Sequence, residues 1–242
     1  MKSLVFQVNI KPNGVKTSGR KRFAYSNSLY DFSNKRAEEY ANKVGADYFC
    51  LSNTDWLGDN YAPCYHKLYI YEVLKNYDKV FYLDSDAIIT KLCPDIFEYD
   101  TFSAVIDNVI DTPSGKKRLQ RKLDIHNITT QQLFHIICDI HNITTQHDYF
   151  CSGVILFDKK FLHLTEQYWK EELDYWKDIK SAQHDQSVLN VLISKYYGKC
   201  NLLDVDWGAW WRSGKYVKHY SGPSQTSQWT EEQFLKWEGK IG

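Results

Sequence analysis

The stretch NYDKVFYLDSDAIIT, residues 76–90, runs from an unbroken apolar segment into two aspartates that stand one residue apart. Residues 80–83 are apolar at every position, which is typical of a strand covered on both faces in a parallel sheet. In an extended strand, side chains two apart point to the same side, so Asp84 and Asp86 should converge while Ser85 faces away. Two carboxylates held together repel each other, and the pattern therefore indicates a cation between them.

Strand and helix signals alternate on both sides of this stretch. We expect strands at 4–8, 47–52, 80–83, 103–107, 149–158 and 200–203, and helices at 34–44, 63–76, 160–177, 186–196 and 229–237. Ser33 and Thr230 are the expected N-caps of two of these helices. The alternation predicts an α/β fold with a mixed, mainly parallel sheet flanked by helices. Since no Pro/Gly/Ser-rich linker divides the chain, we expect residues 1–242 to form a single domain.

One segment, at about 108–147, interrupts this rhythm. The octet DIHNITTQ occurs at 124–131 and again, unchanged, at 139–146. Two copies are too few for a repeat architecture. We therefore interpret the segment as a helical or looped insertion that contains a local duplication.

Composition excludes several classes of partner. The chain has 30 basic and 30 acidic residues, so no net field attracts nucleic acid. The six cysteines form no CxxC pair, which favours reduced thiols. The N-terminal apolar segment is too short for a signal-peptide core, and no segment has the length of a membrane span. We expect a cytoplasmic protein, in the host cytoplasm if the source is viral.

The two aspartates stand at the carboxyl end of a predicted parallel strand, which is the edge where open α/β sheets bind ligands. Hard oxygen ligands at this spacing suit Mg²⁺ or Mn²⁺ bridging to a diphosphate. An alternative is that one aspartate caps the following turn and the other is solvated. The DxD pattern alone leaves both open.

The wider context is more specific, because this stretch resembles the DxD signature of GT-A fold glycosyltransferases. Further segments resemble, in the same order, the retaining families that include glycogenin and bacterial galactosyltransferases. They are HKLYIYEVL (66–74), SAVID (103–107), FCSGVILFD (150–158), HDQSVLN (184–190) and HYSG (219–222). The resemblance covers about residues 60–225. It implies a single GT-A domain, a Rossmann-like nucleotide-diphospho-sugar transferase.

The resemblance also implies a role for individual residues. It places Asp185, Gln186 and Asp107 at the transferred sugar as catalytic residues, and Asp84, Asp86 and His219 around the metal. Donor contacts are implied for Val8, Asn9 and Ile10 (base or ribose) and for Lys67, Asp84, Ser85 and Gly222. Read singly, Lys67 could be an exposed helix lysine, Asp185 a helix N-cap and His219 a core histidine.

The implied activity is metal-dependent transfer of a hexosyl or deoxyhexosyl group from a nucleotide sugar, with UDP as the expected nucleotide. The acceptor would be a glycan or glycoprotein, and the anomeric configuration would be retained. Mn²⁺ is the expected ion because a histidine joins two carboxylates, with Mg²⁺ as the alternative.

The chain departs from the family pattern at two positions. Cys151 stands where the pattern has an asparagine, and Gln225 where a lysine binds the diphosphate; Lys218 could replace that charge. Such departures are typical of a divergent branch, such as the glycosyltransferase domains of large DNA viruses or family-34-like enzymes.

Other functions remain open on the sequence. In haloacid-dehalogenase-like phosphatases a DxD aspartate is the nucleophile, but it follows the first strand, whereas here two strand–helix units precede it. A nucleotidyltransferase would need a glycine-rich loop after the first strand. A non-catalytic module that binds sugar nucleotides or glycans is a further alternative.

Overall fold

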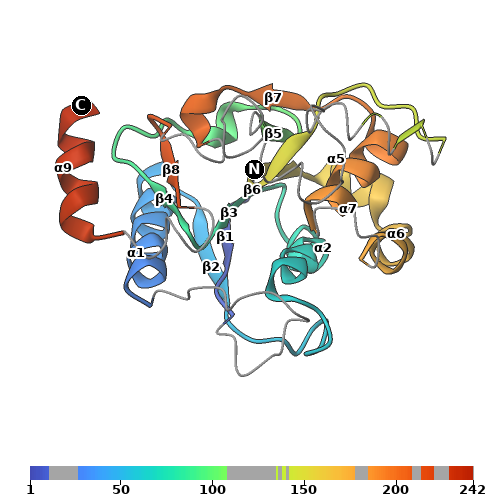
Figure 1. Ribbon diagram of the computed structural model, residues 1–242, viewed down its shortest axis with the longest axis horizontal. Helices are drawn as coiled ribbons and strands as arrows, with labels where there is room; N and C mark the ends of the chain where they lie inside the picture. The colour runs from blue at the N-terminus through green and yellow to red at the C-terminus, as the bar shows by residue number, and fades with distance from the viewer. Residues whose placement is uncertain are drawn as a thin grey trace, which may run out of the picture.

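The computed structural model describes residues 1–10, 27–107, 135, 138–139, 142–177, 185–208, 214–220 and 229–241. Its centre is a six-stranded sheet in the order β2-β1-β3-β6-β5-β7 (Figure 1). The strands are β1 (Ser3–Val8), β2 (Asp47–Leu51), β3 (Lys79–Asp84), β5 (Ser103–Ile106), β6 (Phe150–Asp158) and β7 (Asn201–Leu203). β6 runs antiparallel to β3 and β5, and the other neighbours are parallel. The mixed, mainly parallel sheet is thus confirmed.

The central strands are apolar throughout because both faces of the sheet are covered. On β3, Val80 and Tyr82 join one core cluster, and Phe81 and Leu83 join the other. The first cluster packs under the 3₁₀ helix η1 (Pro63–Tyr69) and the helices α2 (Ile70–Val73), α5 (Lys159–Thr165), α6 (Trp169–Trp176) and α7 (Asp185–Leu192). The second packs against α1 (Asn27–Val44) and the short helices η2 (Ile96–Glu98) and η5 (Val205–Trp207). Figure 1 shows α1 and α2 on opposite sides of the strands.

Several helix boundaries differ from those predicted. α1 begins no later than Asn27, so Ser33 is an interior residue and not an N-cap. Its buried hydroxyl accepts a hydrogen bond from Gln7 and donates one to the carbonyl of Ala87. The predicted helix 160–177 is divided into α5 and α6, and the predicted helix 186–196 ends as the π-helical turn η4 (Ile193–Tyr197).

A second, two-stranded sheet lies beside the first. β4 (Ala87–Ile89) pairs antiparallel with β8 (Val217–His219), and His219 is the partner of Ala87. The closing helix α9 (Glu231–Ile241) packs on this region through Phe234, which clusters with Ile88 and two residues of α1. Thr230 accepts a hydrogen bond from the Gln233 N–H, which confirms it as the N-cap.

Most of the predicted insertion, including the first copy of the duplicated octet, lies outside the described residues. The insertion therefore stays a prediction. Among the helices of the described part, none is long and apolar enough to cross a membrane. All six cysteines are free thiols.

Candidate active site and metal centre

The carboxylate pair lies where β3 ends. Asp84 is the last residue of β3, and Ser85 and Asp86 form a turn before β4 begins. Strand alternation therefore does not bring the two carboxylates together, contrary to our expectation; the turn does. The Ser85 hydroxyl donates a hydrogen bond of 2.6 Å to the carbonyl of Val8, which ties this turn to the end of β1.

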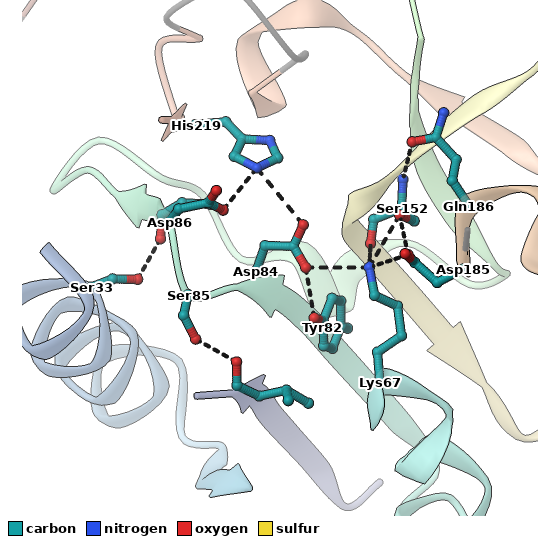
Figure 2. Close-up of polar contacts among 12 residues, drawn as sticks. Ser33, Lys67, Tyr82, Asp84, Ser85, Asp86, Ser152, Asp185, Gln186 and His219 are labelled. Carbon is teal, nitrogen blue, oxygen red and sulfur yellow. Dashed lines mark hydrogen bonds and ion pairs between the residues drawn. The ribbon is translucent and has the colours of Figure 1, made fainter. Parts of the chain in front are cut away.

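His219 completes the cluster through the pairing of β4 with β8. Its Nε2 lies 3.0 Å from Asp86 Oδ1 and 3.8 Å from Asp84 Oδ2 (Figure 2). The three side chains can offer one ligand atom each, all within 4.8 Å of one another. Two carboxylate oxygens and one imidazole nitrogen form a donor set suited to Mn²⁺ or Mg²⁺. The predicted metal ligands are therefore brought together.

Gly153 on β6 leaves the space that this cluster needs. A Cβ at this position would lie 2.4 Å from Cε1 of His219 and 2.8 Å from Oδ2 of Asp84. Both distances are shorter than van der Waals contact. Any side chain at residue 153 would occupy the region where His219 and Asp84 meet, so the arrangement of the residues fits an ion at this point.

The three side chains of the cluster carry interacting charges, with His219 buried and the two aspartates partly exposed. Burial alone would lower the pKa of His219, but the neighbouring Asp86 carboxylate outweighs this and holds the pKa well above its usual value. Burial alone would raise the pKa of Asp84, but Lys67 and His219 outweigh it, and the pKa is lowered. A metal ion would therefore displace a proton from His219 and meet an ionised Asp84.

Lys67 is buried between two carboxylates. Only 2% of its side chain is exposed, so it is not a solvated helix lysine. Its Nζ lies 3.2 Å from Asp84 Oδ1 and 2.6 Å from Asp185 Oδ2. Burial opposes the charge on Lys67, but the two carboxylates outweigh it and raise the pKa of the ammonium group. Lys67 thus connects the three candidate metal ligands to the segment 185–186 through its two ion pairs.

The three residues implied at the transferred sugar also lie together. Asp185 is buried at the first position of α7, and Gln186 follows it. The Gln186 amide donates a hydrogen bond of 2.7 Å to Oδ2 of Asp107, which directly follows β5. These residues come from different elements, and they meet because α7 packs against β6, which in turn pairs with β5.

The structure describes only some of the other residues for which a donor contact is implied. Val8 ends β1 beside the Ser85 turn, and Asn9 and Ile10 follow it, each partly exposed. Gly222 and Gln225 lie outside the described residues. Lys218 Nζ lies 4.3 Å from the centre of the Trp237 ring on α9, and its role in place of the missing lysine stays a prediction.

Two residues beside the site were not singled out in the sequence. The Tyr82 hydroxyl donates a hydrogen bond of 2.6 Å to Asp84 Oδ1, and the Ser152 hydroxyl donates one of 2.6 Å to Asp185 Oδ2 (Figure 2). A signal for Tyr82 was present, since it precedes Asp84 by two residues on one strand and so shares its face. Ser152 lies where the pairing of β5 with β6 shifts, so alternation could not have placed it.

Comparisons with known proteins agree with this fold. A model of the family described as "Glycosyl transferase family 8" matches residues 2–226. A search of curated proteins found no match.

Solved structures resemble the chain over nearly its whole length. A structure of the galactosyltransferase LgtC with donor and acceptor sugar analogs has a TM-score of 0.55 and 16% identity, and covers 98% of this chain and 95% of that one. A glycosyltransferase involved in glycosylation of the major capsid of PBCV-1 has a TM-score of 0.52 and 10% identity. The match covers 100% of this chain and 98% of that one. The bifunctional glycosyltransferase WbbM has a TM-score of 0.55 and 13% identity, and the match covers 99% of this chain and 51% of that one. These likenesses show the GT-A fold.

Proposed function

Because the chain belongs to glycosyl transferase family 8 and is a glycosyltransferase, we propose that it transfers a hexosyl or deoxyhexosyl group from a UDP-sugar to a glycan or glycoprotein acceptor. The observation that carries the proposal is the cluster of Asp84, Asp86 and His219 at the carboxyl end of β3, joined by Lys67 to Asp185. A nucleotide-sugar donor needs positive charge at its diphosphate and polar groups at its sugar. A metal site beside the charged segment 185–186 would supply both.

Asp84, Asp86 and His219 would hold a divalent ion, with Mn²⁺ favoured over Mg²⁺ because one donor is an imidazole. A cation bound there would neutralise the negative charge that develops on the leaving diphosphate. Lys67 lies beside the same cluster and would add a second positive charge near the donor. Val8, Asn9 and Ile10 would contact the base or ribose, and Ser85 and Gly222 would lie along the diphosphate.

The residues at the sugar would mainly position it. Asp185 would accept hydrogen bonds from donor hydroxyls, and Asp107 would hold the Gln186 amide, to which it is already bonded. An amide is a poor nucleophile and a poor base, so Gln186 would steady a sugar hydroxyl or the passing charge. The leaving diphosphate could itself take the acceptor proton, which is compatible with retention of configuration.

A binding module without catalysis would keep the same contacts but release no nucleotide diphosphate, which makes product release the discriminating measurement. A DxD phosphatase would hydrolyse a generic aryl phosphate and would not bind nucleotide sugars.

The proposal can be tested by a thermal-shift screen of UDP- and GDP-sugars with and without Mn²⁺, followed by an assay for nucleotide diphosphate release. A ligand at a hundred times its Kd stabilises a protein by about 2.7 kcal/mol. We expect stabilisation by a UDP-sugar only when Mn²⁺ is present. Tighter calorimetric binding of GDP than of UDP in Mn²⁺ would overturn the nucleotide assignment.

Asp86→Asn is the matched variant for the metal site, and Asp100→Asn is its control, because the Asp100 side chain is fully exposed. We expect Asp86→Asn to fold and to lose the Mn²⁺-dependent shift, since Asp86 lies in a turn beyond the strand end. Asp100→Asn should keep the shift. A folded Asp86→Asn enzyme with undiminished transfer would refute the metal assignment.

A further inference from the structure

Ser152 is a buried residue of β6 that contacts three of the residues placed at the proposed active site. It is 6% exposed. Its hydroxyl donates a hydrogen bond of 2.6 Å to Oδ2 of Asp185 and accepts one of 3.1 Å from Nζ of Lys67 (Figure 2). Its backbone carbonyl accepts a second bond from Lys67, of 2.9 Å, and its N–H points to Oε1 of Gln186 at 3.4 Å.

The backbone contacts would be made by almost any residue at this position, but the contacts of the hydroxyl would not. Oδ2 of Asp185 receives both the Lys67 ammonium and the Ser152 hydroxyl. A carboxylate held by one ion pair can rotate about it, whereas a second donor from a different element fixes its plane. An alanine at residue 152 would remove the Ser152 hydrogen bond to Asp185 and keep the ion pair with Lys67.

The local backbone explains why the hydroxyl can point to Asp185. Ala104 of β5 is opposite Ile155 of β6, but Ile106 is opposite Phe150, so β6 carries extra residues between the two pairs. Ser152 lies within this irregular segment. Irregularities of this kind redirect side chains and are frequent beside active sites.

We propose that Ser152 is a positioning residue that orients Asp185 toward the donor sugar through its hydroxyl. This inference rests on the proposed function, because it assigns the Asp185 carboxylate to the sugar. Among the described residues, the side chains that hydrogen-bond to Ser152 are those of Lys67, Gln186 and Asp185 rather than the three candidate metal ligands, so its loss should affect turnover more than metal binding.

The test compares Ser152→Ala and Ser152→Cys with Ser103→Ala. Cysteine has the shape of serine with a somewhat larger sulfur atom and is a weak hydrogen-bond donor, so it removes the strong hydrogen bond without leaving a cavity. Ser103 is a matched control, because it is a buried serine of β5 whose hydroxyl donates to the carbonyl of Thr101 and accepts from the Asn201 amide, and neither partner is a site residue.

We expect both Ser152 variants to lower kcat about tenfold, since a hydrogen bond to a charged group is lost and a reacting geometry is loosened. Donor KM should change less than kcat, because the groups proposed to hold the metal and the diphosphate are unchanged. The Mn²⁺-dependent thermal shift should stay within about twofold of wild type, because neither variant removes a metal ligand. Ser103→Ala should keep wild-type kcat. A Ser152→Ala enzyme with wild-type kcat, or a loss that affects kcat, KM and the Mn²⁺ shift equally, would overturn the proposal.

A readout without activity comes from a double-mutant cycle of unfolding free energies between Ser152→Ala and Asp185→Ala. We expect a coupling between the two changes, and their strict additivity would overturn the inferred contact. Wild-type protein that turns over no nucleotide sugar in the same assay would instead refute the proposed function. The two failures are therefore distinguishable.

Discussion

Tyr82 donates its phenol hydrogen to Oδ1 of Asp84 over 2.6 Å, on the side of the carboxylate that also faces Lys67. The other oxygen, Oδ2, faces His219. The Asp84 carboxylate therefore connects Lys67 with His219. Because Tyr82 and Lys67 donate to Oδ1, Oδ2 is the oxygen directed at the candidate metal site. Partners of this kind orient metal ligands and influence metal affinity.

Tyr82→Phe should weaken Mn²⁺ binding about tenfold, because it removes one donor that orients Asp84 while keeping the buried ring. Calorimetric titration with Mn²⁺ measures this directly. Tyr40→Phe is the control, because its hydroxyl also bonds in the interior, to the Pro94 carbonyl and the Ile96 N–H, and neither partner belongs to the metal site. Equal Mn²⁺ affinity in wild type and Tyr82→Phe would contradict the role of this hydroxyl.

Gly153→Ala should abolish Mn²⁺ binding and lower Tm, because its Cβ would lie 2.4 Å from the His219 ring and 2.8 Å from the Asp84 carboxylate. Gly239→Ala in α9 is the matched control, since a Cβ there meets nothing within 4 Å. Alanine is favoured over glycine in helix interiors by about 0.8–1.0 kcal/mol, so Gly239→Ala should leave Tm unchanged or raise it. Normal Mn²⁺ binding by Gly153→Ala would show that the cluster has more room than the structure indicates.

His66 should make the protein less stable in mild acid. It is fully buried, and this burial lowers its pKa below 6.5. As pH falls through about 6.5, the unfolded chain gains a proton at this residue while the folded chain does not, so stability is lost until the folded pKa is reached.

This effect can be isolated by comparing metal-free wild type with His66→Leu in urea unfolding at pH 7.5, 6.5 and 5.5. The unfolding free energy of wild type relative to the variant should decrease as pH falls. The comparison is needed because His219 has a raised pKa and contributes with the opposite sign: its stabilisation is present below its unfolded pKa and is lost as pH rises. A difference that does not change with pH would contradict the prediction for His66.

Transfer should proceed with retention of anomeric configuration. An inverting enzyme needs a base on the face opposite the leaving diphosphate. Gln186 cannot serve as that base, and its amide is already bonded to Asp107. NMR of the first product formed will decide this: an anomeric configuration opposite to that of the donor would make Asp185 the leading candidate for an inverting base.

The sequence predicted the parts of this protein whose cause is local. The apolar run of β3 predicted burial on both faces, and Thr230 predicted the start of a helix. Both features depend on residues that are neighbours in the chain. The family resemblance selected residues that the structure then brings together, including Asp185, Gln186 and Asp107.

Only the tertiary structure decided how the residues of the site contact one another. Lys67 looks like a solvated helix residue in the sequence, and it is buried because Asp84 and Asp185 offset the cost of removing its charge from water. His219 reaches Asp86 because β8 pairs with β4. Ser33 lies inside α1, where its hydroxyl bonds to Gln7 of β1 and Ala87 of β4. Such contacts join residues far apart in the chain, so their energies depend on the packed fold and leave no local pattern to read.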